Sequence, residues 1–285
     1  MSILDETYTL ADGSPIPKLG LGTWMIDDDR AAQAVREAIE MGYRNIDTAQ
    51  AYGNERGVGE GVRTSGVARE RLFVSAKLAA EAKDYDTATA AIDESLATMG
   101  LDYLDLMLIH SPQPWDDFRG GDYAQGNREA WRALEEAQTA GRIRSIGVSN
   151  FLEADLDNIL AAATVAPQVN QLLVHAGNTP EALLAYCADH DILVEAYSPI
   201  AHGEILDNAD LDAMAHRYGA TVPQLCIRYD LQLGTVALPK TANPEHMRAN
   251  AQVDFEISAE DMAALRRLDA RDYGESSAFP VYSGR

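Results

Sequence analysis

Short apolar segments alternate along the chain with longer stretches in which apolar residues recur every three or four positions. The first pattern predicts buried β-strands, and the second predicts amphipathic helices. Eight strand-like segments occur, at residues 19–22, 44–47, 72–75, 104–109, 143–148, 168–171, 192–196 and 235–238. Helical patterns lie between them, at residues 29–41, 85–99, 128–140, 152–163, 180–190 and 222–233.

Eight strands that alternate with helices over about 250 residues are typical of a closed (β/α)8 barrel, the TIM barrel. A doubly wound open sheet is the competing architecture, but it normally carries a glycine-rich fingerprint after its first strand. The segment Gly20-Leu21-Gly22-Thr23-Trp24 lacks this fingerprint. We therefore predict an α/β protein with a TIM-barrel fold.

The residues ahead of the first barrel strand predict a β-hairpin. Asp12-Gly13 is a turn signal between two short arms, and Pro15 and Pro17 restrict the second arm to an edge strand. We expect this N-terminal hairpin to cap the bottom of the barrel. No repeat or linker divides the chain, so we expect one domain over residues 1–285. The irregular stretches 111–127 and 272–285 are either functional covers or disordered, and the second is a candidate substrate loop.

Charge and cysteine content exclude several classes of function. The 285 residues include 23 Lys plus Arg against 45 Asp plus Glu, a formal net charge of −22. Nucleic acids and anionic membranes attract proteins through basic residues, so neither is an expected partner. The two cysteines lack CxxC spacing, so we expect neither a disulfide scaffold nor a metal site. Because no leader-like or membrane-spanning stretch is evident, we expect a cytoplasmic protein, which we take to be a monomer.

Four ionisable side chains lie at or just after successive predicted strands. Asp47 closes the second strand, and Tyr52 lies on the loop that follows it. Lys77 follows the third strand and His110 ends the fourth. The active site of such a barrel lies at the C-terminal ends of the strands, so these four residues should share one site. An ammonium lowers the pKa of a nearby tyrosine, which could then protonate a carbonyl oxygen that His110 orients.

Each of these residues alone could also serve a purely structural purpose. An isolated Asp after a strand often caps a helix, and a single Tyr or His at a barrel rim usually serves packing. At successive strand ends, however, the four together favour a catalytic group. Only four of the 23 basic residues are lysines, so each is a candidate for a task that arginine cannot perform. Among these four, the position of Lys77 fits such a task.

Five motifs in the chain resemble signatures of the aldo-keto reductase family. The first is Gly42-Tyr43-Arg44-Asn45-Ile46-Asp47-Thr48-Ala49-Gln50-Ala51-Tyr52-Gly53-Asn54-Glu55. The others follow in order as Ile146-Gly147-Val148-Ser149-Asn150-Phe151, Val169-Asn170-Gln171, Ala196-Tyr197-Ser198-Pro199 and Leu238-Pro239-Lys240-Thr241-Ala242-Asn243-Pro244-Glu245-His246. The resemblance runs from about residue 8 to residue 270. It is greatest to the bacterial branch that contains 2,5-diketogluconate reductases.

This resemblance implies an NADPH-dependent oxidoreductase that reduces an aldehyde or ketone, such as a diketo or keto-sugar acid. It implies that Tyr52 is the proton donor and that the nicotinamide stacks on Tyr197. Ser149, Asn150 and Gln171 would hold the carboxamide, and the pyrophosphate would lie along residues 198–206. Lys240 and Thr241 match positions that hold the adenosine 2′-phosphate. The other implied cofactor residues are Gly22, Thr23, Trp24, Ser198, Pro199, Ile200, His246 and Asn250.

Some of these positions could be structural, and one departs from the family pattern. Ser149 and Asn150 could simply cap the following helix, and Tyr197 could be a core residue. His246 stands where many members carry Arg, so NADH is a second candidate cofactor, and Arg248 is a candidate compensating cation. Candidate walls of the substrate pocket are Trp24, Tyr52, His110 and Trp115.

Two other functions fit parts of the sequence. A nicotinamide-binding barrel could have a regulatory or sensing role with little turnover, because fold does not determine function. Lys77 could also be the Schiff-base lysine of a barrel aldolase. The aldolase interpretation leaves Tyr52 and the segment around Lys240 unexplained.

Overall fold

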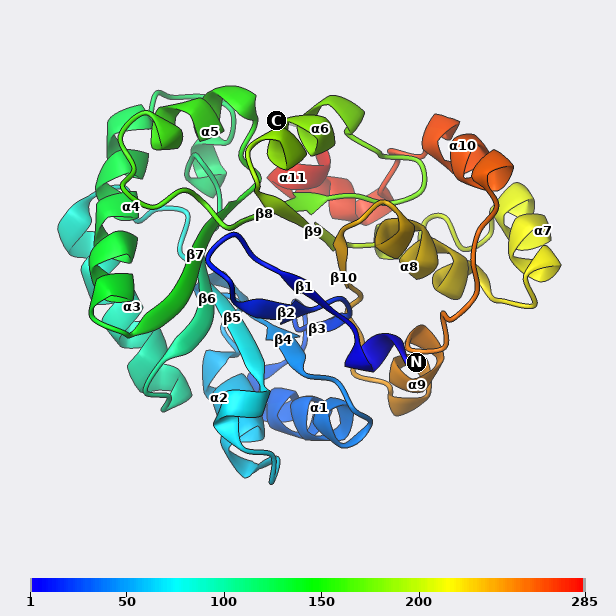
Figure 1. The fold of residues 1–285 in the computed structure, drawn as a ribbon, viewed down its shortest axis with the longest axis horizontal. Helices are drawn as coiled ribbons and strands as arrows, with labels where there is room; N and C mark the ends of the chain where they lie inside the picture. The colour runs from blue at the N-terminus through cyan, green and yellow to red at the C-terminus, as the bar shows by residue number, and fades with distance from the viewer. Residues whose placement is uncertain (1, 284–285) are drawn as a thin grey trace.

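The computed structural model, which describes residues 2–283, is a closed barrel of eight parallel strands with helices around it (Figure 1). The strands pair in chain order. The first and last strands close the barrel, since the Ala237 N–H donates to the Lys18 carbonyl over 2.9 Å. The predicted TIM barrel is confirmed, with strands β3 (Gly20–Gly22), β4 (Asn45–Asp47), β5 (Phe73–Leu78), β6 (Leu104–Ile109), β7 (Ile143–Ser149), β8 (Val169–Leu173), β9 (Leu193–Tyr197) and β10 (Val236–Leu238).

Each predicted strand is present, but β5 is longer than predicted. It continues to Leu78, and all six of its residues are buried. The sequence pattern placed Lys77 after the strand, but Lys77 lies within it. Because the charged Lys77 side chain interrupts the apolar run, the pattern ended the predicted strand too early.

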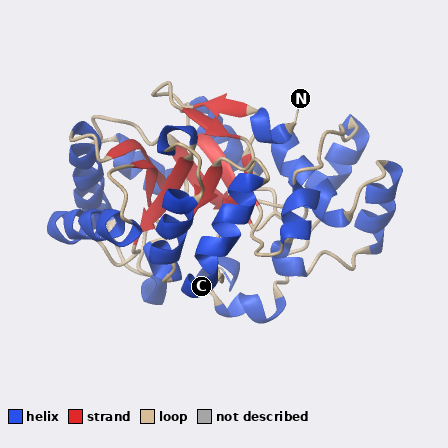
Figure 2. Cartoon of the chain, turned by 90° about the horizontal axis from the view of Figure 1, so that it is seen from below, coloured by secondary structure: helices blue, strands red, loops and turns tan. Residues whose placement is uncertain are grey.

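The helices form the outer layer of the molecule and the strands the inner one (Figure 2). The six predicted helices are present, and further helices occur that the patterns did not indicate.

The first predicted irregular stretch, 111–127, ends at residue 123 and not at 127, because α4 begins at Ala124. Residues 272–285 include two short helical segments at Gly274–Ala278 and Pro280–Ser283, while residues 284–285 lie outside the described residues. The α-helices are α1 (Asp28–Glu40), α2 (Glu55–Thr64), α3 (Tyr85–Met99), α4 (Ala124–Thr139), α5 (Glu153–Leu160), α6 (Glu181–Asp189), α7 (Ala209–Arg217), α8 (Val222–Gln232), α9 (Pro244–Asn250), α10 (Ala259–Arg267) and α11 (Pro280–Ser283).

The predicted N-terminal hairpin is confirmed and lies across the strands in Figure 1. Strands β1 (Thr7–Thr9) and β2 (Pro15–Pro17) pair antiparallel. Leu10 and Ile16 are buried against side chains at the lower end of the barrel. The Asp12 N–H donates to Gln168 Oε1 over 2.7 Å. The hairpin therefore closes the end of the barrel opposite the predicted site.

Both cysteines are unpaired and buried. Among the described residues, no helix combines the length and apolar character needed to cross a membrane.

Helix α8 contains a carboxyl group, that of Asp230, which is buried without a hydrogen-bond partner among the described residues. The Asp230 side chain is fully buried, and neither of its carboxyl oxygens has a hydrogen-bond partner within residues 2–283. Burial raises the pKa of Asp230 well above its usual value, which favours the neutral form of this group in the folded protein. In the unfolded chain the same group ionises at an ordinary acidic pH.

We therefore expect Asp230→Asn to stabilise the protein at neutral pH. The raised pKa makes folding bind a proton, so wild-type stability from this group is lost as pH rises above the unfolded pKa. The variant lacks this dependence, so proton linkage should give it an advantage of about 1–3 kcal/mol in the free energy of unfolding near pH 7. Urea unfolding from about pH 4 to pH 8 should show the gap between variant and wild type widening with pH. A gap that stays constant would contradict the assignment.

Candidate active site

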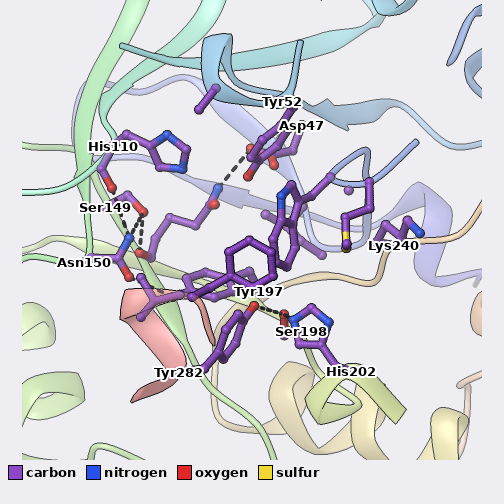
Figure 3. A pocket seen from close by; sticks show the side chains of 18 of the residues that line it. Asp47, Tyr52, His110, Ser149, Asn150, Tyr197, Ser198, His202, Lys240 and Tyr282 are labelled. Carbon is purple, nitrogen blue, oxygen red and sulfur yellow. Dashed lines mark hydrogen bonds between the residues drawn. The ribbon is translucent and has the colours of Figure 1, made fainter. Parts of the chain in front are cut away.

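A cavity of about 440 Å³ opens at the C-terminal ends of the barrel strands (Figure 3). Strand ends form its floor, while Trp115 and the segment Phe279–Tyr282 contribute to its walls. Of the four predicted catalytic residues, Asp47, Tyr52 and His110 line the cavity. Lys77 lies behind them with no exposed surface. The structure thus brings the four predicted residues together.

Asp47 and Lys77 form a buried ion pair at the base of the cavity. Lys77 Nζ donates to Asp47 Oδ1 and Oδ2 over 2.7 and 2.8 Å, and to the Thr48 carbonyl over 2.9 Å. Burial is the largest single effect and by itself would lower the pKa of Lys77. The charge and hydrogen bonds of Asp47, together with the electrostatic contributions of Tyr52 and Glu195, outweigh it, and the pKa is raised. The lysine is therefore a fixed cation. Because Asp47 accepts this bond pair, it is not a simple helix cap.

Tyr52 lies in a short turn after β4, next to this cation. Its ring centre is 5.0 Å from Lys77 Nζ. Burial raises the pKa of Tyr52, and the positive charge of Lys77 only partly opposes this. The predicted lowering of the pKa is therefore wrong in its net direction, because the sequence does not show how completely the phenol is enclosed. A protonated phenol beside a fixed cation can give its proton to a developing oxyanion.

His110 follows β6 and faces the ring of Tyr52, with ring centres 5.7 Å apart. Burial, followed by the positive charges of Lys77 and Lys83, holds the pKa of His110 well below its usual range. The imidazole is therefore neutral. Its Nδ1 is buried and has no partner among the described residues. A neutral imidazole at this place can hydrogen-bond an oxygen in the cavity.

Ser149 and Asn150 lie where β7 ends and do not cap α5, whose N-cap position is Leu152. Asn150 Nδ2 donates to the His110 carbonyl and to Ser149 Oγ, each over 3.0 Å. The Tyr197 hydroxyl donates to Asn150 Oδ1 over 2.8 Å. Tyr197 also lines the cavity, so it is not solely a core residue.

Gln171 bridges two carboxyl groups beneath the cavity. Its Nε2 donates to Asp47 Oδ1 over 3.0 Å and to Glu195 Oε2 over 2.9 Å. Because carboxylate oxygens accept hydrogen bonds, the amide atom between them is the nitrogen. The amide oxygen Oε1 therefore remains available as an acceptor. Burial, with the negative charge of Asp47, raises the pKa of Glu195 to about 7. Sequence reasoning missed Glu195, which appeared to be only one polar residue in a strand.

The predicted cofactor residues divide into two groups. Eleven line the cavity, whereas Thr241, His246 and Asn250 lie outside its wall. Arg248 lies along a second groove with Leu4 and Met41, so the structure gives no support to its compensating role beside Lys240. The eleven are Gly22, Thr23, Trp24, Ser149, Asn150, Gln171, Tyr197, Ser198, Pro199, Ile200 and Lys240.

Lys240 is an exposed cation at the rim of the cavity. Partial burial lowers the pKa of its ammonium, and so does the positive charge of Arg30, while Asp27 opposes the change. Arg30, at the start of α1, therefore contributes positive charge near Lys240. No local pattern in the sequence predicted this, because some 210 residues separate the two positions.

Aromatic side chains form the outer part of the cavity. The ring of Trp24 contacts Phe279 edge-on at 5.0 Å and stacks with Tyr282 at 6.1 Å. The Tyr282 hydroxyl shares a hydrogen bond of 2.9 Å with Ser198 Oγ (Figure 3). On the other side, Trp115 lies edge-on to His110 at 4.9 Å. All four predicted substrate-pocket residues thus line the cavity, together with C-terminal residues that were predicted only as a stretch.

Comparison with known proteins identifies relatives over most of the chain. The model of the aldo/keto reductase family matches residues 18–270. Glyoxal reductase of Bacillus subtilis is 41% identical over 93% of this chain and 94% of its own. An aldo-keto reductase of Mycolicibacterium vanbaalenii is also 41% identical, over 92% of each chain.

Solved structures give the same result. The aldo/keto reductase from Brucella melitensis has a TM-score of 0.86 and 38% identity, covering 93% of this chain and 99% of its own. The Bombyx mori aldo-keto reductase, solved in complex with NADP, has a TM-score of 0.86 and 34% identity, covering 97% and 98%. With the strand-end site and these matches together, the chain belongs to the aldo/keto reductase family and is an oxidoreductase of that family.

Proposed function

We propose that the protein reduces an aldehyde or ketone to the alcohol with NADPH, and that Tyr52 donates the proton. The observation that carries this proposal is the protonated phenol of Tyr52 beside the buried Asp47–Lys77 pair in an enclosed cavity. NADPH, when bound, supplies the hydride to the carbonyl carbon. The residues of the chain bind, orient and protonate the substrate.

The proton transfer follows from the local electrostatics. Burial keeps the Tyr52 phenol protonated, so it is ready to donate. As negative charge develops on the substrate oxygen, the O–H proton moves to that oxygen and the phenolate remains. The ammonium of Lys77, 5.0 Å from the ring centre, stabilises this phenolate. Neutral His110 orients the same oxygen by a hydrogen bond.

The hydrogen-bonding groups on the cavity floor fit a nicotinamide carboxamide. Both amide protons of Gln171 are donated to the carboxyl groups of Asp47 and Glu195. Those of Asn150 are donated to the His110 carbonyl and to Ser149 Oγ. Acceptor oxygens remain on both side chains, Oε1 of Gln171 and a second lone pair on Oδ1 of Asn150. They suit the NH2 group of the carboxamide, and Tyr197 offers a ring face beside them.

Basic groups at the rim suit the phosphates of the dinucleotide. Lys240 is available to the 2′-phosphate, and NADPH is the preferred cofactor for this reason. Thr241 and Asn250 are proposed to contact the adenosine portion outside the cavity. His246 is exposed and stands where many family members carry Arg, which leaves NADH as a secondary cofactor.

The alternatives fit the structure less well. Lys77 has no exposed surface and all three of its protons are hydrogen-bonded, so its amine is not free for Schiff-base formation. A purely regulatory role does not need the Tyr52 and Lys77 arrangement. Small dicarbonyls belong among the substrates to test, because a relative with 41% identity is a glyoxal reductase. Diketo and keto-sugar acids belong there as well.

Replacing Tyr52 by Phe should lower the rate of NADPH oxidation with the best carbonyl substrate by a factor of about 100 or more. The variant keeps the ring but lacks the proton. Its dissociation constant for NADPH should not change. Tyr186→Phe is the matched control, since this hydroxyl bonds to Asp157 on the outer helices. Equal rates for Tyr52→Phe and wild type would refute the role of Tyr52. Tight NADPH binding by the wild type without turnover on any carbonyl would favour the regulatory alternative.

Replacing Lys240 by Met should weaken NADPH binding by about five- to tenfold, because a charge-assisted contact to phosphate is lost. NADH binding should change little, and added salt should shrink the NADPH effect. Titration of both dinucleotides, followed by protein fluorescence, measures this. Lys18→Met serves as the control, because Lys18 pairs with Glu6 beside the hairpin. An equal loss for both dinucleotides would argue against a 2′-phosphate contact.

A further inference from the structure

The side chain of Arg119 joins the loop after β6 to the strand end that carries Asn150. Arg119 Nη2 donates to the Asn150 carbonyl over 2.9 Å. Its Nη1 lies 3.2 Å from Asp155 Oδ2, and this carboxylate also accepts from the Leu152 N–H at the start of α5. The guanidinium is therefore held between two acceptors. The side chain is 28% exposed and does not form part of the cavity wall.

Asn150 is the centre of a hydrogen-bond network. Besides the bonds of its side chain, its N–H donates to the Gln171 carbonyl over 3.0 Å. Its bonds to the barrel thus reach Gln171, His110, Ser149 and Tyr197. The bond from Arg119 comes from a loop instead. It fixes the one polar group of Asn150 that the strand ends leave free, the main-chain carbonyl.

Both ends of the Arg119–Asn150 bond are in a strained conformation. The φ angles of Arg119 and Asn150 are +60° and +63°, in the left-handed region that residues other than glycine seldom occupy. Such conformations persist only where the surroundings fix them. A charge-assisted hydrogen bond between the two residues holds each in place.

The same loop carries an aromatic wall of the cavity. Trp115 contacts His110, Phe118 stacks on Trp115 at 6.0 Å, and the Arg119 guanidinium lies 4.7 Å over the Phe118 ring. A continuous series of contacts therefore runs from the substrate side of the cavity to the Asn150 peptide.

We propose that Arg119 is a positioning residue for the dinucleotide. Its guanidinium fixes the Asn150 peptide, and through Asn150 Oδ1 it fixes the Tyr197 hydroxyl and ring. The Tyr197 ring is thereby held in the orientation in which the nicotinamide can stack on it. Because Arg119 and Trp115 lie in the same loop, this orientation depends on the position of Trp115. Arg119 itself contacts neither cofactor nor substrate. The inference rests on the proposed function, which supplies the ligand.

The test measures NADPH dissociation constants for purified full-length protein by fluorescence titration at low and high salt. Arg119→Met, which keeps an unbranched apolar chain, should raise the dissociation constant about tenfold, as expected for loss of a charge-assisted hydrogen bond. Arg119→Lys keeps the charge, but one ammonium cannot serve both acceptors in the same way, so it should stay several-fold weaker than wild type. The turnover number at saturating NADPH should fall much less than the affinity. Arg142→Met, which removes a surface pair with Asp93, should bind like wild type.

The outcomes separate a positioning role from two simpler ones. If Arg119 acts only by long-range attraction, Arg119→Lys or high salt will abolish the difference, and the proposal is overturned. If Arg119 serves only general stability, the midpoint of thermal unfolding without ligand will drop while the NADPH affinity of the folded variants stays unchanged, which overturns it too. Equal affinity of Arg119→Met and wild type overturns the role of Arg119 alone. Failure of the wild type to bind either dinucleotide overturns the proposed function and, with it, this inference.

Discussion

The buried ion pair between Asp47 and Lys77 is the interaction on which the site depends. Removing two charges from water costs several kcal/mol per ion, so such a pair needs well-placed partners to persist. Here three protons of Lys77 meet three oxygens, and Ser75 and Gln171 also donate to Asp47. The adjacent strands β4 and β5 hold both residues rigidly. The proposed proton donor Tyr52 thus faces a cation that need not reorganise during a reaction.

The charge distribution resolves an apparent conflict in the composition. A chain with a net charge of −22 is proposed to bind a dinucleotide that is itself strongly anionic. Negative charge in the deep part of the cavity is reduced, since Lys77 balances Asp47 and burial raises the pKa of Glu195 to about 7. Neutral His110 adds no charge. Lys240 supplies positive charge at the rim, with Arg30 nearby, where phosphates can remain partly hydrated.

The sequence predicted the features that depend on local patterns and missed those that depend on contacts across the fold. The eight strands and the gathering of Asp47, Tyr52, Lys77 and His110 follow from alternation and from the rule that barrel sites lie at strand ends. Helix α2 was missed because glycines lower helix propensity. Their purpose appears only in the fold, where a Cβ on Gly57 would lie 2.1 Å from the Asp28 carbonyl of α1. Likewise, the pKa of Tyr52 depends on burial, and the contact of Tyr282 with Ser198 spans 84 positions, so neither is visible in a local pattern.

The architecture separates the chemistry from the shape of the substrate pocket. Strand ends hold the ion pair and the groups proposed to bind the carboxamide, whereas Trp115, Phe279 and Tyr282 come from segments outside the barrel strands. Changes in these aromatic walls can therefore alter which carbonyl compound fits without disturbing Asp47 and Lys77. The Arg119–Asn150 hydrogen bond is an exception to this separation. It connects the loop that carries Trp115 to Asn150, which accepts a hydrogen bond from the Tyr197 hydroxyl. With the proposed role of Arg119, a loop substitution that displaced it would affect dinucleotide binding as well as substrate choice, which would constrain how freely that loop can vary.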